Sequence, residues 1–421
     1  MIEKILFEQD VTMRQKCLAL LSIAALMVGC GQAGALNPDQ LIVVDTHIDL
    51  PYRLNRNYEN VGQLTEHGDF DYARARRGGL SAAFMSIFVP VEKQSAGLAK
   101  DFADHLIDLV ESTSSRNADK FEIARSTRDI ARIARTNRIA LSLGMENGAA
   151  IENDLLNVWH FYNRGIRYIT LAHGKSNQIS DSSYDPNRQW GGLSPFGVKV
   201  VQEMNRLGII VDVSHITDEA LLDVLEVSET PVLATHSSAR SFTPGFERNL
   251  SDELIGKIAD NGGVVQVNFG SAFLTQAANE WYLQYYTEET AYRSEHELGQ
   301  YEPVPEFEEA YRTANPPPYA TLDDVLDHID HIVNLAGIDH VGFGSDFDGV
   351  GDSLPIGLKS VADYPALIEG LRERGYGEDD VLKIAGRNTL RVWAAAEEHA
   401  KIQRLLALHE TDSGWYRGRY K

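Results

Sequence analysis

The stretch Leu41-Ile-Val-Val-Asp-Thr-His47-Ile-Asp49-Leu50 is apolar and β-branched at first and polar where it ends. This composition predicts a buried strand. Residues two apart on a strand project from the same face, so His47 and Asp49 should point the same way at the end of the strand. Such a pair is either the beginning of a metal site or a buried histidine with an aspartate partner, and the pair alone leaves both open.

The same kind of run recurs along the chain. Including the first, eight apolar runs predict strands, at residues 41–49, 80–89, 139–145, 168–173, 209–215, 232–236, 264–269 and 341–346. Amphipathic stretches between them predict helices, at residues 97–118, 127–136, 155–164, 195–207, 218–227 and 252–261. Continuous apolar strands that alternate with helices indicate a parallel sheet covered on both faces.

Eight strand-helix units within one domain predict an α/β fold of the (β/α)8 TIM-like barrel type over residues 41–395. An eight-stranded doubly wound sheet is the alternative. No G-x-G-x-x-G follows the first predicted strand, which weakens a dinucleotide-binding version of that alternative. Residues 271–320 interrupt the rhythm as an aromatic and acidic insert, predicted to be a lid, an oligomer contact or a solvated loop-helix segment. A further helix and tail are predicted over residues 396–421.

Composition limits the partners of the chain. The 421 residues are 43% hydrophobic, which is enough for a large core, and the formal net charge is −22. So negative a protein is not expected to bind nucleic acid or an anionic membrane surface. Cys17 and Cys30 are the only cysteines, so the domain that follows them has no disulfide, no thiolate nucleophile and no cysteine zinc site.

The N-terminus predicts a targeting segment over residues 1–30, followed by a short tether over residues 31–40. Residues 13–16 are basic, residues 17–28 are too short an apolar run to span a bilayer comfortably, and the run ends in Met27-Val-Gly-Cys30. This resembles a bacterial lipoprotein signal and implies a lipid on Cys30, with export to the periplasmic side of a bacterial membrane, most often the outer membrane. Three acidic groups precede Met13, so Met13 is the expected translation start. An ordinary signal peptide or a buried apolar segment is the alternative.

Polar side chains gather at the predicted strand ends. Six of the predicted strands carry, at or near their ends, a residue that can bind a metal ion or transfer a proton: His47, Glu146, His173, His215, His236 and Asp346. In a barrel these ends form one rim, which is where barrel active sites lie. By contrast, His340 falls at the opposite rim, and His328 and His331 are predicted to lie on a solvated helix face.

Imidazole and carboxylate ligands without thiolate suit catalytic zinc, with manganese or cobalt as substitutes. Three histidines with Asp49 and Glu146 are more ligands than one open catalytic ion needs. Two ions that share a bridging carboxylate would use all of them, and would hold a hydroxide between them to attack a scissile carbonyl. The rim therefore predicts a metal-dependent hydrolase.

The ordered set of motifs is specific. It comprises Asp45-Thr-His-Ile-Asp49, Gly144-Met-Glu-Asn-Gly148, Leu171-Ala-His173, Val211-Asp-Val-Ser-His215, Thr235-His-Ser-Ser238, Arg248-Asn249 and Gly342-Phe-Gly-Ser-Asp-Phe-Asp-Gly349. With these the chain resembles the membrane (renal-type) dipeptidases, peptidase family M19, from about residue 41 to residue 395. The resemblance implies a zinc dipeptidase on a barrel of the metallo-dependent hydrolase type. It also implies tolerance for a D-residue at the second position of the dipeptide, and a homodimer.

The resemblance further implies a role for each rim residue. Two zinc ions would bind His47 with Asp49 and His215 with His236, and Glu146 would bridge them. His173 would stabilise the oxyanion, Arg248 would hold the substrate carboxylate, and Asp346 would hold the substrate amine or pass a proton to the leaving group. Asp348 competes with Asp346 for that role or caps a turn. The insert at residues 271–320 departs from the family pattern. Other readings are a binuclear-metal lactonase, amidase or phosphoester-cleaving enzyme, and an inactive binding lipoprotein.

Overall fold

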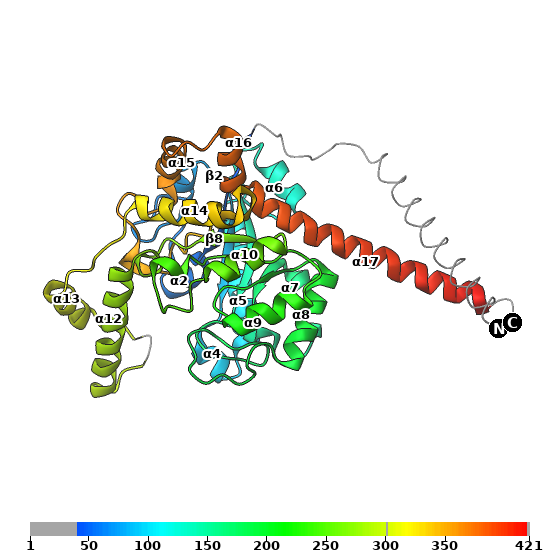
Figure 1. Ribbon diagram of the computed structural model, residues 1–421, viewed down its shortest axis with the longest axis horizontal. Helices are drawn as coiled ribbons and strands as arrows, with labels where there is room; N and C mark the ends of the chain where they lie inside the picture. The colour runs from blue at the N-terminus through cyan, green and yellow to red at the C-terminus, as the bar shows by residue number, and fades with distance from the viewer. Residues whose placement is uncertain (1–39, 300–301, 419–421) are drawn as a thin grey trace. The chain divides into compact units, whose positions relative to one another are not determined.

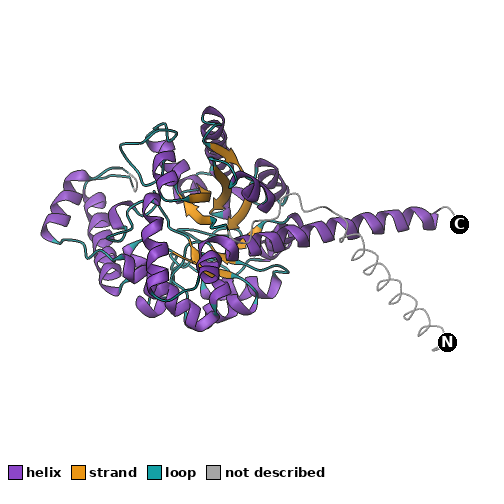
Figure 2. Ribbon diagram, turned by 90° about the horizontal axis from the view of Figure 1, so that it is seen from above, coloured by secondary structure: helices purple, strands orange, loops and turns teal. Residues whose placement is uncertain are grey.

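Eight parallel strands close into a barrel in the computed structural model, which describes residues 40–299 and 302–418 (Figures 1 and 2). Neighbouring strands pair in chain order, and β1 pairs with β9 to complete the ring. This closure excludes the doubly wound alternative. The strands of the ring are β1 (Val43–Ile48), β2 (Leu80–Phe88), β4 (Ile139–Glu146), β5 (Ile166–Thr170), β6 (Ile210–Asp212), β7 (Leu233–Ala234), β8 (Val264–Val267) and β9 (Val341–Phe343).

A ninth strand, β3 (Phe121–Ile123), was not predicted from the sequence. It pairs in parallel with β4 alone, while β4 also pairs with β2 to keep the ring intact. With only three residues, of which Phe121 alone is buried, β3 is too short to produce an alternation in the sequence.

All six helices predicted from the sequence are present, and short helices that were not predicted lie between β1 and β2 and directly after β2. Together they surround the strands (Figure 2). Side chains that accept a hydrogen bond from the first turn begin several of them, for example Ser194, Thr217 and Ser251. The helices up to the insert are α2 (Leu50–Arg56), α3 (Tyr72–Arg77), α4 (Val91–Ser95), α5 (Ala99–Arg116), α6 (Thr127–Ile133), α7 (Leu156–Arg164), α8 (Pro195–Leu207), α9 (Asp218–Val227) and α10 (Asp252–Asp260).

The insert after β8 is helical. It comprises α11 (Ser271–Leu274), α12 (Gln276–Glu295) and α13 (Pro305–Ala314), and α12 and α13 lie together at the left of Figure 1. Its aromatic residues pack on one another: the Trp281 ring stacks on Tyr285 at 5.4 Å, and Tyr285 meets Tyr311 edge-on at 5.3 Å. The aromatic composition therefore serves the packing of these two helices.

The chain after the insert returns to the barrel through α14 (Leu322–Ala336), α15 (Tyr364–Glu373), α16 (Glu378–Leu382) and α17 (Asn388–Gly418). The helix predicted within residues 396–421 is part of α17, which begins earlier than predicted, at Asn388, and continues to Gly418. Near its start the buried Trp393 packs on Phe84 of β2, with ring centroids 5.2 Å apart. This contact ties the last helix to the barrel core.

The solvated face predicted for His328 is wrong. His328 lies on α14 with its side chain fully buried; its Nδ1 accepts from the Ala239 backbone N–H at 3.1 Å and its Nε2 donates to the Leu274 carbonyl at 3.0 Å. His331, one turn on, is partly exposed and pairs with Asp252 at 2.8 Å. His328 thus joins α14 to the loop after β7 and to the insert.

The predicted signal segment, Cys30 and the tether up to residue 39 lie outside the described residues. Within the part of the chain that the structure describes, no helix combines the length and the apolar character needed to cross a bilayer.

Candidate metal centre

All the rim residues predicted from the sequence stand at the carboxyl ends of barrel strands. His47 is within β1 and Asp49 follows it, Glu146 ends β4, and three more histidines and one aspartate come two or three residues after their strands: His173, His215, His236 and Asp346. Most of the observed strands end earlier than predicted, but the residues still meet at one rim. Parallel strands in a closed barrel bring residues 300 positions apart to the same mouth.

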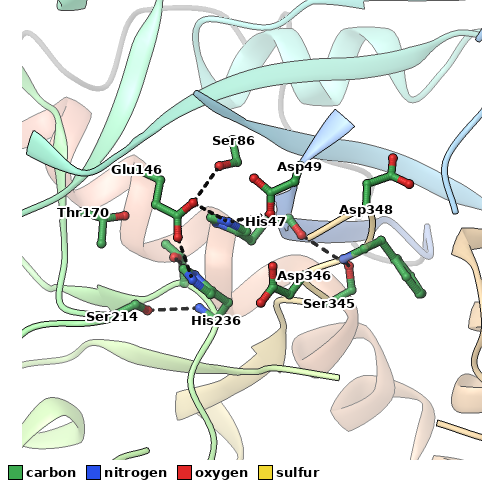
Figure 3. Close-up of polar contacts among 12 residues, drawn as sticks. His47, Asp49, Ser86, Glu146, Thr170, Ser214, His236, Ser345, Asp346 and Asp348 are labelled. Carbon is green, nitrogen blue, oxygen red and sulfur yellow. Dashed lines mark hydrogen bonds and ion pairs between the residues drawn. The ribbon is translucent and has the colours of Figure 1, made fainter. Parts of the chain in front are cut away.

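The carboxylate of Glu146 is the centre of the cluster (Figure 3). Its Oε1 lies 3.0 Å from Nε2 of His215, 3.2 Å from Nε2 of His236 and 3.5 Å from Nε2 of His173. Its Oε2 lies 3.5 Å from Nε2 of His47. One carboxylate oxygen therefore faces three imidazoles and the other faces the fourth.

The buried donor set fits divalent cations. Three groups of residues each bring ligand atoms within 4.8 Å of one another: His47, Glu146 and His236; Glu146, His173 and His215; and His47, Asp49 and Asp346. Among the residues that the structure describes, Nε2 of His47 and Oδ1 of Asp49 are buried without a hydrogen-bond partner. The Nε2 atoms of His215 and His236 are 2.8 Å apart. Nitrogen and oxygen atoms that converge in this way are the ligands zinc takes in catalytic sites.

Backbone strain is concentrated at the rim. His215 has φ +69°, Asp346 +63° and Asp348 +65°, values that residues with a side chain adopt infrequently. Each follows its strand by three to five residues, where the chain must turn sharply. Left-handed residues other than glycine cost about 1–3 kcal/mol and cluster at functional sites. The strain aims the side chains of His215 and Asp346 back over the barrel.

Burial and neighbouring charges favour, in Glu146, His215 and His236, the protonation states that metal binding requires. Burial raises the pKa of Glu146, but the neighbouring imidazoles, above all His47 and His173, lower it more, so that this pKa lies well below its usual range. Burial, with Arg248 nearby, holds the pKa values of His215 and His236 well below the ordinary histidine value. A metal ligand has to be an ionised carboxylate or a neutral imidazole, as these are.

His47 differs from the other imidazoles. Burial opposes its charged form, but Tyr168, Glu146 and Asp49 raise its pKa well above the ordinary value. The field at this point of the rim therefore favours positive charge. The same field favours a metal cation, which competes with the proton for Nε2.

Sequence reasoning missed the residues that hold the ligands in place. Nδ1 of His47 lies 2.9 Å from the Tyr168 hydroxyl. Asp45 accepts hydrogen bonds from the backbone N–H groups of His47 and Ser345 and from the hydroxyls of Ser345 and Tyr364. Asp45 thereby joins the ends of β1 and β9. The sequence did contain a signal for the role of Asp45. Burying an aspartate inside an apolar strand costs free energy unless its oxygens accept hydrogen bonds, so such a residue should have donors around it.

The residues predicted to contact substrate flank the cluster. The Arg248 side chain is buried, and its guanidinium donates to the Ser237 hydroxyl at 2.8 Å and to the His236 carbonyl at 2.7 Å. Its Nε has no partner in the described part of the chain. Asp346 accepts from the Asn268 amide at 2.8 Å, and burial raises its pKa to about 7. Arg248 is thus a built element of the site and no surface arginine.

Asp348 plays a structural part, as a link between two distant loops and not as the cap of its own turn. It exchanges hydrogen bonds with Asp69: Asp348 Oδ1 accepts from the Asp69 N–H at 2.6 Å, and Asp69 Oδ2 accepts from the Asp348 N–H at 2.8 Å. Arg53 lies 3.4 Å from the same Oδ1. The Asp348 side chain is turned away from Asp346 and Glu146 (Figure 3).

An aromatic row borders the site beside Arg248. The Tyr184 ring is 5.8 Å from the His215 ring and 6.2 Å from Phe246, and Phe246 is 5.7 Å from Phe273. Phe273 belongs to α11 and lies under the Arg248 guanidinium at 5.3 Å. The insert therefore reaches the site through its first helix.

A closed (β/α)8 barrel with a buried histidine-carboxylate cluster at the carboxyl ends of its strands defines a metal-dependent hydrolase. Comparison with known proteins narrows this class. The model of the membrane dipeptidase family, peptidase family M19, matches residues 35–405. An uncharacterized dipeptidase of Schizosaccharomyces pombe is 33% identical over 389 residues, which is 89% of this chain and 84% of the relative.

Solved structures agree with this match. The probable dipeptidase PvdM of Pseudomonas aeruginosa superimposes with a TM-score of 0.74 at 27% identity, over 86% of this chain and 97% of that one. A metallo peptidase of Rhodobacter sphaeroides, liganded with a phosphinate mimic of the dipeptide L-Ala-D-Ala, gives 0.69 at 25% identity, over 85% of this chain and all of that one. The chain belongs to the membrane dipeptidase family, peptidase family M19, and is a metallo-dipeptidase.

Proposed function

We propose that the protein hydrolyses dipeptides with two zinc ions held at the barrel rim. The observation that supports this is the convergence of four imidazoles on the two oxygens of Glu146. His47 and Asp49 would hold one ion, His215 and His236 the other, and Glu146 both. When bound, such a pair of cations supplies Lewis acidity for the scissile carbonyl and lowers the pKa of water toward neutrality.

The remaining residues would bind the two ends of the substrate. The guanidinium of Arg248 suits a substrate carboxylate because it is planar, charged and held in place by Ser237 and the His236 carbonyl. His173, whose Nε2 is 3.5 Å from Glu146, would donate to the carbonyl oxygen as it gains negative charge. Asp346 would bind the amino group or move the proton to the leaving amine.

A dipeptide with a D-residue at its C-terminal position is included in the proposed substrates. Support comes from the relative whose structure holds a phosphinate mimic of L-Ala-D-Ala. The aromatic row of Tyr184, Phe246 and Phe273 borders one side of the position proposed for the substrate carboxylate. The preference for an L or a D residue would depend on whether the substrate side chain points toward this row.

The test is turnover of a dipeptide panel by the purified protein. We expect hydrolysis of L,L and L,D dipeptides that is lost on chelation and restored by Zn²⁺, with about two zinc ions per chain by elemental analysis. Manganese or cobalt should restore activity in part. Absence of turnover with every dipeptide, in protein that contains metal, would contradict the proposal; protein without metal affinity would instead fit an inactive binding protein.

We further propose that the chain is exported and anchored through a lipid on Cys30. The basic residues 13–16, the short apolar run and the cysteine that ends it support this. Expression in a bacterium with radiolabelled palmitate should label the protein and place it in the membrane fraction. Cys30→Ser should remove both the label and the membrane association; retention of both in this variant would contradict the anchor.

A further inference from the structure

Asp212 is a buried carboxylate beneath the rim that none of the proposed substrate contacts uses. It ends β6 and is fully buried. Its Oδ1 accepts from the backbone N–H groups of Ser214 at 3.0 Å and Thr235 at 2.9 Å, and its Oδ2 accepts from the hydroxyls of Thr235 at 2.7 Å and, at close range, Thr170. Each oxygen of this carboxylate thus accepts two hydrogen bonds; one of the four comes from its own segment and the other three from the neighbouring β5 and the end of β7.

The hydrogen bond between Asp212 and the Thr235 hydroxyl determines which nitrogen of the next residue, His236, carries the imidazole proton. A threonine hydroxyl has one hydrogen, and Asp212 takes it because a carboxylate only accepts. The other contact of the same hydroxyl is Nδ1 of His236 at 2.9 Å. In this contact Oγ1 of Thr235 is therefore the acceptor, and Nδ1 of His236 carries the imidazole proton.

The opposite ring nitrogen of His236 then has a free lone pair. This Nε2 faces Oε1 of Glu146 at 3.2 Å and Nε2 of His215 at 2.8 Å, in the middle of the cluster (Figure 3). A metal-binding histidine needs its lone pair on the nitrogen that faces the ion, and its second nitrogen commonly donates to a carboxylate. Here a hydroxyl stands between the ring and the carboxylate.

We propose that Thr235 is a positioning residue that relays Asp212 to His236 and fixes the tautomer in which His236 binds metal. The proposal rests on the proposed metal function of His236. The backbone of Thr235 is held independently, since its N–H donates to Asp212 and its carbonyl accepts from the Thr46 hydroxyl at 2.5 Å. Removal of the hydroxyl alone therefore isolates the relay.

Thr170 offers a matched control. It is buried as fully as Thr235 and donates to the same oxygen of Asp212, but among the described residues it makes no hydrogen bond to His236. Thr170→Val and Thr235→Val each replace one such hydroxyl by a methyl group of similar size. Thr235→Ser restores the hydroxyl without the methyl group.

The first experiment is calorimetric titration of the metal-free variants with Zn²⁺. We expect Thr235→Val to weaken one of the two proposed zinc sites by about 10–100-fold, which is the usual effect of removing a hydrogen bond to a metal-binding residue. Thr235→Ser and Thr170→Val should stay within about threefold of the wild type. The proposal is overturned if Thr235→Val keeps both affinities, or if Thr170→Val loses as much as Thr235→Val.

The second experiment reads the tautomer directly. Long-range ¹H–¹⁵N NMR of the metal-free protein labelled with [¹⁵N]histidine should show His236, assigned through the signal missing in His236→Asn, with its proton on Nδ1. In Thr235→Val the Nδ1–H form should no longer dominate. A wild-type proton on Nε2 would overturn the relay. Failure of the wild type to bind zinc, with the proton on Nδ1, would contradict the metal function and leave the relay standing.

Discussion

Gly349 lies directly behind the carboxylate of Asp49. A methyl group on Gly349 would stand 2.2 Å from Oδ2 of Asp49 and 2.3 Å from Oδ1 of Asp346. Both distances are far below van der Waals contact, so the two carboxylates occupy the volume that a side chain at position 349 would need. The last residue of the Gly-Phe-Gly-Ser-Asp-Phe-Asp-Gly motif is therefore a steric part of the candidate metal centre.

Gly349→Ala should displace the Asp49 and Asp346 carboxylates while the fold remains. These are the ends of side chains and can move, and displacement of a ligand by about 1 Å can lower kcat/KM on the order of 100-fold. We expect that loss in dipeptide hydrolysis, with weaker zinc binding and little change in the thermal midpoint. Gly351→Ala is the control, because a methyl group there meets no atom of the described residues within 4 Å and adds only backbone strain at φ +56°. Equal activity losses in the two variants would remove the steric explanation.

Glu146→Gln should weaken both proposed zinc sites together. The amide keeps the size of the side chain but removes the negative charge that faces four imidazoles. We expect the zinc content to fall from about two ions to below one per chain. The loss in kcat/KM should exceed roughly 100-fold, which is the upper end of the loss caused by mutating a residue that only hydrogen-bonds to a metal ligand. Ser86→Ala, which removes a 3.2 Å hydrogen bond to Oε2 and leaves the charge, is the control. Two retained ions and full activity in Glu146→Gln would exclude the bridging role.

The strands and the rim could be predicted because both rest on strong regularities. Apolar runs of five to ten residues mark the barrel strands, and polar residues at their ends must share a rim once the strands are parallel. His47, Glu146 and Asp346 meet for this reason. Residues that do not follow strand ends are less accessible to such reasoning: Arg248 lies in the long loop after β7, and only the family resemblance identified it.

The errors have physical causes. β3 is three residues long and pairs with a single neighbour, so no periodicity reveals it. His328 occupies a position of the apolar stripe of α14, between Val325 and Ile332, and its polarity concealed this. Thr235 and Asp212 act through hydrogen bonds between strands, and the donor of such a bond cannot be identified before the strands are placed.

Arg248→Ala should impair only substrates with a free carboxylate. A charged hydrogen-bonding partner in a buried site is worth roughly 2–5 kcal/mol, so KM for a dipeptide should rise on the order of 100-fold, while hydrolysis of the corresponding dipeptide amide should hardly change. Arg248→Lys should recover part of the loss, because the ammonium keeps the charge without the planar pair of donors. A uniform loss on acid and amide substrates would show that Arg248 serves only to hold Ser237 and the loop.

Stability should fall in acid partly through His328. Burial lowers the pKa of His328 to about 4, while the unfolded chain titrates at about 6.5. Well above pH 6.5, for example at pH 8, both states are neutral and His328 adds no pH dependence. As the pH falls toward 4 the unfolded chain takes up the proton first, because a protonated Nδ1 would face the Ala239 N–H, and stability is lost by up to about 3 kcal/mol.

Urea unfolding of the wild type and His328→Asn at several pH values tests this. At pH 8 the variant should be less stable, because it loses the bonds to Ala239 and Leu274. Between pH 8 and pH 4.5 the difference should narrow by about 2 kcal/mol, since only the wild type carries the buried imidazole. His331→Gln, one turn further along α14, leaves His328 in place and should keep the wild-type loss. Parallel pH profiles for the wild type and His328→Asn would mean that the buried ring is protonated as readily in the folded chain as in the unfolded one.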